Sequence, residues 1–334
     1  MEIGKVPHDV LKNIVFDKLK FFNPDVTIRP GIGEDCAVLN CGEQLVVLSC
    51  DPITGALNEV GRLAVHVSCN DIAASGVRPL GLLVSILLPA GSTESDLEKI
   101  MTEIAETATA IGVSVIGGHT EVTDAVTRIV INTTAIGLSK QKTICSAGAK
   151  PGDKLIVTKT VGLEGTAIIA NENEAALKKQ FGDGFVSDAK ACLNQISVLE
   201  EGIIAGKLGP DIVHAMHDIT EGGIFGAAWE LAEASGTGVN IFLEKIPIAP
   251  VTKTLCDYYK INPCRLISSG SMMMATTNPE LLIQKLSEKG IPAAVVGEMT
   301  SNPQERFIFK TGCKHDSEKS ILKQPQPDEL YKLP

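Results

Sequence analysis

The sequence predicts an α/β protein with two domains, and three observations support this prediction. The chain has 334 residues, which exceeds the usual size of a single domain. Hydrophobic residues make up 44% of it and aromatic residues only 4%, a composition typical of soluble α/β proteins rich in Ala, Ile, Val and Gly. Segments with helical spacing alternate with short apolar runs along the chain. We therefore expect one domain over residues 1–148 and a second over residues 149–334.

The first half contains three segments with apolar residues at helical spacing, and these predict helices over residues 8–19, 60–75 and 94–111. Asn23-Pro24 ends the first and Gly76 stops the second. Short apolar runs bounded by turns predict strands over residues 36–39, 45–49, 80–88, 113–116 and 128–138.

A turn-rich segment at residues 146–153, Ser-Ala-Gly-Ala-Lys-Pro-Gly-Asp, is the predicted boundary between the halves. Beyond it, strands are expected over residues 154–158, 211–215, 238–243, 293–296 and 306–309. Helices are expected over residues 165–170, 188–205, 222–234, 251–257 and 280–289. The tail after Cys313, with its Lys-Gln-Pro-Gln-Pro run, is expected to be loosely held.

Charge and hydropathy exclude several classes of function. The net charge of -10 argues against a nucleic-acid partner, because such binding depends on clusters of Lys and Arg that neutralise phosphates. The longest apolar stretch, residues 80–90, contains Pro89 and is too short to span a membrane, and the chain does not open like a signal peptide. The nine scattered cysteines form no CxxC pair, so we expect mostly reduced core thiols. The expected location is cytoplasmic.

Asp71 is the only formal charge between Arg62 and Arg78, within the apolar run from Leu63 to Val77. A carboxylate costs several kcal/mol to bury unless a cation or hydrogen-bond donors receive it. Three interpretations are open: an aspartate on a helix surface, a buried aspartate paired with an arginine, and a metal ligand.

The segment Gly-Ile-Gly-Glu-Asp at residues 31–35 is a second candidate. It is neither a Walker motif nor a Rossmann fingerprint, since the third glycine is missing and its carboxylates would face a pyrophosphate. Carboxylates on a glycine-rich loop match hard cations such as Mg²⁺, which bridge to substrate phosphates. The alternative is an ordinary acidic turn before a strand.

Further candidates lie at turns where glycine permits close approach of a ligand. Gly-Gly-His-Thr-Glu at residues 117–121 follows a short strand, and the alternative there is a tight turn with exposed polar residues. In the second half, Thr220 is a reasonable N-cap, and the free N–H groups at Gly222 could meet an anion. Lys159 could offer a charge to a phosphate or be a solvated loop lysine, and the Gly4-Lys5 pair has the same ambiguity.

In order and spacing, these segments resemble the AIR synthase superfamily. This ATP-dependent group contains aminoimidazole ribonucleotide synthetase, selenophosphate synthetase, thiamine-monophosphate kinase and the hydrogenase-maturation factor HypE. The resemblance covers nearly the whole chain and is greatest to the HypE branch, through Asn70-Asp71 with the small residues after it, Pro79, the Asp218 motif and Ala-Glu-Ala-Ser-Gly at residues 232–236.

The resemblance implies a PurM-like architecture. In it an N-terminal domain forms a barrel-like interface in a homodimer, and a C-terminal α/β sandwich domain folds over the nucleotide. ATP would lie in a cleft near the dimer interface, with its phosphates bound through Mg²⁺. The family chemistry is phosphoryl transfer to an acceptor, which makes positioning and charge neutralisation the protein's main tasks.

Site residues follow from the resemblance by matching position. Asp35, Asp51 and Asp71 would be metal ligands or their close supports, with Asn70 orienting the set. Asp218 would act beside the transferred group.

The glycine-bearing segments would complete the site. Gly117 and Gly118 would allow close backbone approach, with His119 or Glu121 near the phosphates beside Thr120. Gly4 and Lys5 would belong to an N-terminal segment that closes over the phosphates.

Two features depart from the HypE pattern. HypE proteins end in a cysteine that carries the carbamoyl group, whereas the last cysteine here is Cys313, so we expect an activity other than carbamoyl dehydration. His119 replaces an acidic residue usual in that loop. We therefore expect an ATP- and Mg²⁺-dependent enzyme that activates an oxygen of a small molecule or protein-borne group. The alternatives are a small-molecule kinase resembling thiamine-monophosphate kinase and a nucleotide-binding maturation partner without turnover.

Overall fold

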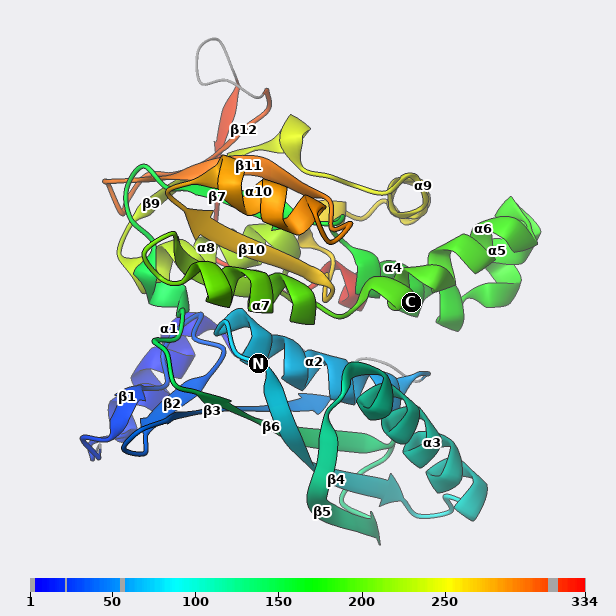
Figure 1. Ribbon diagram of the computed structural model, residues 1–334. Helices are drawn as coiled ribbons and strands as arrows, with labels where there is room; N and C mark the ends of the chain where they lie inside the picture. The colour runs from blue at the N-terminus through cyan, green and yellow to red at the C-terminus, as the bar shows by residue number, and fades with distance from the viewer. Residues whose placement is uncertain (1–3, 22, 55–57, 312–317, 334) are drawn as a thin grey trace.

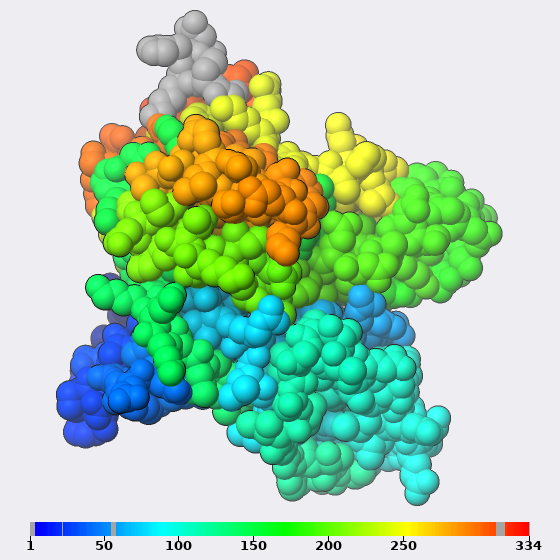
Figure 2. All heavy atoms as spheres, in the orientation of Figure 1, coloured from blue at the N-terminus to red at the C-terminus, as the bar shows by residue number. Residues whose placement is uncertain are grey.

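The computed structural model describes residues 4–21, 23–54, 58–311 and 318–333 as two stacked α/β units (Figure 1). Cys313 lies outside the described residues. The space-filling view shows the two units in contact across a broad seam (Figure 2). The two sheets fall on either side of residues 146–153, and the exact domain boundary stays a prediction.

The first unit is built on a six-stranded sheet in the order β1-β2-β3-β6-β4-β5. Its strands are β1 Val26–Ile28, β2 Ala37–Asn40, β3 Leu45–Ile53, β4 Pro79–Pro89, β5 Ser114–Thr123 and β6 Val130–Ser139. Helix α2 Val60–Ala74 lies on this sheet and packs beside α3 Glu94–Ile111, which links the parallel strands β4 and β5. Among the described residues the edge strands β1 and β5 do not pair, so the expected barrel is not closed within one chain.

The second unit is built on a seven-stranded sheet in the order β13-β12-β9-β11-β7-β10-β8. Its strands are β7 Lys154–Thr158, β8 Val213–Ile219, β9 Gly238–Phe242, β10 Ser271–Thr276, β11 Ala293–Thr300, β12 Arg306–Phe309 and β13 Lys319–Ile321. Its helices are α4 Leu163–Glu172, α5 Glu174–Phe181, α6 Asp183–Lys190, α7 Leu199–Leu208, α8 Gly223–Ser235, α9 Pro250–Tyr259 and α10 Pro279–Ser287. Helices α5 and α6 project to the side (Figures 1 and 2).

The units share their hydrophobic core. Leu63 and Ile72 of the first unit belong to the same buried cluster as Leu163 and Ile168 of the second. Asn70, which was predicted to orient a metal site, also joins the units. Its Nδ2 donates to the carbonyl oxygen of Ile196 at 2.9 Å, and its Oδ1 accepts from the amide of Val198 at 2.9 Å.

Most predicted elements are present, but some expectations were wrong, and some elements, among them β1 and α5, were missed. The single helix over residues 188–205 is interrupted, because a 3₁₀ turn at Ala191–Gln195 separates α6 from α7. Strand β10 was missed although it pairs with both β7 and β8. Helix α1 is short, His8–Val10, and continues as a π-helical turn, Leu11–Val15, and a 3₁₀ turn, Phe16–Lys18.

The C-terminal tail is packed, contrary to expectation. Leu322, Asp328 and Glu329 are buried. The backbone amide of Gly222 donates to Asp328 Oδ2 at 2.7 Å, and that of Asn262 donates to Glu329 Oε2 at 3.3 Å. No helix within the described ranges is long and apolar enough to cross a membrane.

Candidate functional site

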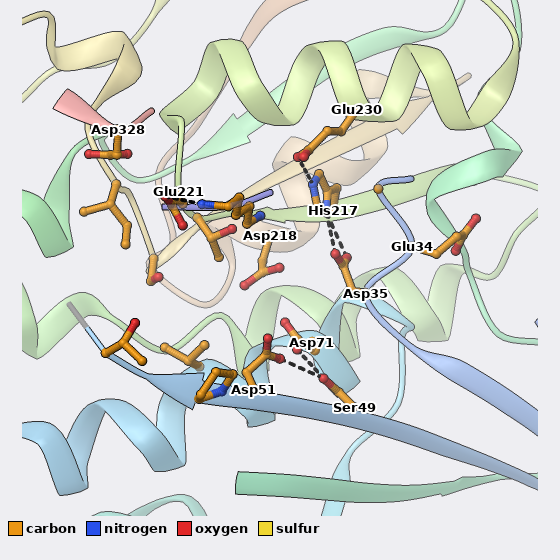
Figure 3. Close-up of a pocket in the computed structure, with 18 of the residues that line it drawn as sticks. Glu34, Asp35, Ser49, Asp51, Asp71, His217, Asp218, Glu221, Glu230 and Asp328 are labelled. Atoms are coloured by element: carbon orange, nitrogen blue, oxygen red, sulfur yellow. Dashed lines mark hydrogen bonds and ion pairs between the residues drawn. The ribbon is translucent and has the colours of Figure 1, made fainter. Parts of the chain in front are cut away.

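A cavity of about 420 Å³ lies between the two units, and it is lined by an unusual number of acids. The N-terminal segment, the loop at residues 31–35, β3, α2, β8, α8 and the C-terminal segment all contribute to its wall. Nine carboxylates line it, from Glu34, Asp35, Asp51, Asp71, Glu164, Asp218, Glu221, Glu230 and Asp328. The basic side chains in the lining are Lys5, His8 and His217. Figure 3 shows carboxylates from both units pointing into the same space.

Asp71 and Asp51 form the wall contributed by the first unit. Ser49 donates a short hydrogen bond to Asp71 and contacts Asp51 Oδ2 at 3.1 Å (Figure 3). Burial, and then the charges of Asp218 and Asp51, raise the pKa of Asp71 well above its usual range. No lysine or arginine of the described residues pairs with Asp71. The surface and arginine-pair interpretations of this residue are therefore both wrong.

Asp218 faces these two carboxylates from the second unit. It is 1% exposed, and its Oδ2 is buried with no hydrogen-bond partner. Burial, followed by the charge of Asp35, raises the pKa of Asp218 to about 8. A buried oxygen without a donor is costly unless a ligand supplies one.

His217 lies between Asp35 and Glu230 and contacts both. Its Nδ1 lies 2.7 Å from Asp35 Oδ1 and its Nε2 lies 3.0 Å from Glu230 Oε2. Burial lowers the pKa of His217, but Asp35 and Glu230 raise it more, so the net pKa is well above the usual value. Both nitrogens therefore act as donors. Asp35, His217 and Asp218 offer atoms within 4.8 Å of one another, and both nitrogens of His217 are engaged by Asp35 and Glu230.

Glu230 anchors this arrangement from helix α8. Burial raises the pKa of Glu230, but Lys5 and the two histidines lower it more, so the net pKa is well below the usual range. Sequence reasoning missed it, although Glu230 is the only formal charge between Glu221 and Glu233. The argument applied to Asp71 would have identified it.

The loop at residues 31–35 packs against α8 and is more than an acidic turn. Gly33 has φ +76°, and a Cβ there would lie 3.1 Å from both the Cβ and the carbonyl oxygen of Glu230. Only glycine allows the loop to approach this closely and deliver Asp35 to the cavity.

The N-terminal segment covers the cavity. The Lys5 amide donates to Glu221 Oε1 at 3.1 Å, and His8 Nε2 lies 3.0 Å from Glu230 Oε1. The charges of Glu230 and Glu221 raise the pKa of Lys5 despite opposing desolvation. Gly4 has φ +115°, and a Cβ there would lie 2.8 Å from Glu221 Oε1. The segment is docked at the site.

Two predicted phosphate-binding groups are occupied elsewhere. The Lys159 ammonium lies 2.6 Å from Glu201 Oε1 and donates to three backbone carbonyls, away from the cavity lining. The Gly222 amide is taken by Asp328, so it is not free for an anion. In this chain both residues have structural contacts.

The segment at residues 117–120 lies on edge strand β5 and not in the cavity lining of the chain. Gly118 has φ +151°, and a Cβ there would overlap the carbonyl oxygen of Val84, so strand pairing requires this glycine. His119 Nε2 lies 3.1 Å from Glu121 Oε2, with both side chains exposed, while Thr120 pairs with β4. Within one chain these residues do not join the acidic cavity.

The donor set fits a divalent cation. Asp35, Asp51, Asp71 and Asp218 supply carboxylate oxygens, the ligands that Mg²⁺ prefers, and Asp218 Oδ2 lacks a partner. Within the described part of the chain, the lining holds nine carboxylates against one lysine and two histidines. Bound cations would relieve this repulsion.

Comparison with known proteins identifies related sequences across both units. Residues 33–139 match the family described as AIR synthase related protein, N-terminal domain, and residues 150–310 match its C-terminal domain. A Methanocaldococcus jannaschii protein named for hydrogenase expression/formation is 32% identical over 316 residues, which cover 89% of this chain and 88% of that protein. Carbamoyl dehydratase HypE of Escherichia coli is 29% identical over 273 residues, 79% of this chain and 77% of that protein.

Solved structures share the fold. HypE in a HypE–HypF complex superposes with a TM-score of 0.77 at 24% identity, covering 95% of this chain and 99% of that chain. HypE in complex with ATP superposes with a TM-score of 0.67 at 21% identity, covering 98% of each chain.

Proposed function

This chain belongs to the AIR synthase related protein family, and on that premise we propose that it is an ATP- and Mg²⁺-dependent enzyme of the HypE-like branch. It would transfer a phosphoryl group from ATP to an oxygen of a small molecule or protein-borne group, in hydrogenase or metallocofactor maturation. The names of the relatives support the branch, and the HypE structure with ATP supports the nucleotide.

One observation carries this proposal: Asp71 and Asp218, buried aspartates from different units, face one cavity, and neither forms an ion pair with any described residue. Asp71 is 6% exposed and Asp218 is 1% exposed. Two such carboxylates facing one cavity would repel each other and any phosphate. A nucleotide could enter only together with divalent cations, which is how ATP is normally handled in phosphoryl transfer.

The roles of the residues follow from their positions. Asp35, Asp51, Asp71 and Asp218 would hold the Mg²⁺ ions. Bound Mg²⁺ would neutralise phosphate charge in the transition state. His217 orients Asp35, and Lys5 brings the nearest ammonium group to the cavity.

The cavity walls would exclude water from the transferring group. The docked N-terminal segment lies on one side, and Leu330 and Tyr331 of the C-terminal segment form another wall. The protein supplies positioning and charge and needs no covalent nucleophile.

Calorimetric titration of the full chain with ATP tests this proposal. We expect binding in Mg²⁺, loss of binding in EDTA, and at least about tenfold weaker binding by Asp71→Asn, which removes one charged ligand. Asp124→Asn, which alters an exposed aspartate before β6, controls for the change in net charge. Equal affinity in Mg²⁺ and in EDTA would contradict the proposal.

Turnover separates the proposed enzyme from its alternatives. ADP release stimulated by a compound whose oxygen is then phosphorylated supports phosphoryl transfer. A stable phosphate ester of a vitamin-like compound as the product would favour the small-molecule kinase. Tight ATP binding with no ADP release under any acceptor would favour a maturation partner without turnover.

We also propose that the chain forms a homodimer through the first sheet. Strand β5 is an exposed edge, and Leu80 (57% exposed), Ile116 (56%) and Val122 (62%) place apolar side chains in solvent on β4 and β5. Facing copies of this sheet would cover those side chains and complete the barrel left open in one chain. Such a dimer would bring residues 117–120 to the interface.

Light scattering on a sizing column tests the dimer. Ile116→Asp should run as a monomer, because it places a charge in the buried interface. Ile321→Asp, at an exposed position on β13, should remain dimeric. A monomeric wild type, or a dimeric Ile116→Asp, would contradict the proposed interface.

A further inference from the structure

A second cavity of about 930 Å³ is lined largely by residues 326–333 of the C-terminal segment. Its lining holds four cations, Arg128, Arg265, Lys323 and Lys332, and three carboxylates, Glu172, Asp328 and Glu329. Four cations against three carboxylates leave an excess of positive charge, whereas the acidic cavity holds nine carboxylates. We call it the basic cavity, since this excess favours an anion that the acidic cavity would repel.

Three of these cations come from distant parts of the chain. Arg128 precedes β6 of the first unit, Arg265 belongs to a 3₁₀ turn after α9 of the second, and Lys323 begins the C-terminal segment. Chain folding, and not local sequence, brings them together.

Two of the cations have no carboxylate partner. Lys332 is paired with Glu329 Oε1 at 2.6 Å. Arg128 lies near Glu172: burial raises the pKa of Glu172, and the charge of Arg128 partly opposes that rise. Arg265 and Lys323 pair with no acid among the described residues. The guanidinium of Arg265 is held 5.5 Å from the ring centroid of Phe225, which limits its motion.

The two cavities share a wall. Thr54, Asp328, Leu330 and Tyr331 line both of them. Asp328 and Glu329 fasten the C-terminal segment through the amides of Gly222 and Asn262. A ligand in the basic cavity would therefore contact residues that also line the acidic cavity.

We propose that the basic cavity binds the anionic end of the phosphoryl acceptor, so the acceptor is a small molecule with a carboxylate or phosphate group beside its reacting oxygen. This deepens the proposed function and rests on it. Arg265 and Lys323 bind the anion, and the reacting oxygen reaches past Tyr331 into the acidic cavity. The separation of charge keeps the acceptor anion away from the nine carboxylates.

Anion titration in EDTA tests this assignment, because without a divalent cation the acidic cavity repels anions. Inorganic phosphate and succinate serve as probes, and the one that binds more tightly identifies the acceptor's anionic group as phosphate or carboxylate. Arg265→Gln should weaken binding of the preferred probe about tenfold, whereas Arg265→Lys should retain most of it. Lys289→Gln, at an exposed site after α10, is the matched control and should bind as the wild type does.

A titration with ATP and Mg²⁺ separates this inference from the proposed function. Wild type and Arg265→Gln should bind ATP equally, since the basic cavity serves the acceptor. An equal loss of ATP affinity in Arg265→Gln would assign the cavity to the nucleotide and overturn the inference, as would failure of both anions to bind. Failure of the wild type to bind ATP, with anion binding intact, would instead refute the proposed function.

Discussion

Asp218→Asn should stabilise the protein in the absence of divalent cations. The pKa of Asp218 is raised from 3.8 to about 8, chiefly by burial. A raised carboxyl pKa means that the folded state binds the proton more tightly than the unfolded state does. The protonated carboxyl of Asp218 therefore contributes fully to the free energy of unfolding below pH 3.8, and this contribution is lost as pH rises toward 8.

The size of the effect follows from this pKa difference. Between pH 3.8 and pH 7 the wild type loses at most about 4 kcal/mol of unfolding free energy through Asp218, and by pH 5 it has lost about 2 kcal/mol. The neutral amide of Asp218→Asn does not suffer this loss. The variant should therefore exceed the wild type in unfolding free energy by more at pH 7 than at pH 5.

Urea unfolding in EDTA at both pH values measures this difference. Mg²⁺ should then stabilise the wild type and not Asp218→Asn, because the variant lacks a ligand charge. Asp124→Asn should track the wild type at both pH values. A variant that is less stable than the wild type at pH 7, or a difference that does not change with pH, would refute the reasoning.

Three other substitutions test structural assignments. Lys159→Met should lower the unfolding free energy by about 3 kcal/mol by leaving a buried carboxylate unpaired, whereas Lys154→Met, in a half-exposed pair, should cost under about 1 kcal/mol in urea unfolding. Gly118→Ala should destabilise the first sheet by about 3 kcal/mol, because the new Cβ would overlap the carbonyl oxygen of Val84. In the control Gly117→Ala the new Cβ meets only the side chain of Leu83, so thermal melts should show a smaller drop in melting temperature for this variant. Asp328→Ala should speed hydrogen exchange of the C-terminal segment about tenfold, and unchanged exchange would show that the segment is held by other contacts.

Local patterns predicted much of the fold. Helix α3 has apolar residues at regular helical spacing and a capping box at Thr93, so its bounds match the prediction. Strand β10 was missed because its run, Ser-Met-Met-Met-Ala-Thr, is buried on both faces and shows no alternation. The packed tail could not be predicted, since its burial depends on Asp328 reaching an amide that lies 106 residues away along the chain.

The candidate site was proposed from a sequence rule, that a charge standing alone in apolar sequence needs a partner. Asp71 satisfies that rule, and Glu230 satisfies it equally but was passed over. Lys159 was assigned to the phosphates and Asn70 to orienting the metal site. Lys159 instead pairs with Glu201 within the second unit, and Asn70 joins the two units. Their partners lie in other segments, and no spacing along the chain indicates whether a polar side chain faces a ligand or a neighbouring backbone.

The most direct test of the central claim is a crystal structure of the full chain with a non-hydrolysable ATP analogue and Mn²⁺ in place of Mg²⁺. Anomalous scattering locates the metal independently of the nucleotide. The account predicts a manganese peak bridging the triphosphate to carboxylates of Asp71 and Asp218. A bound nucleotide with no metal between these residues, or a metal held elsewhere, would contradict it.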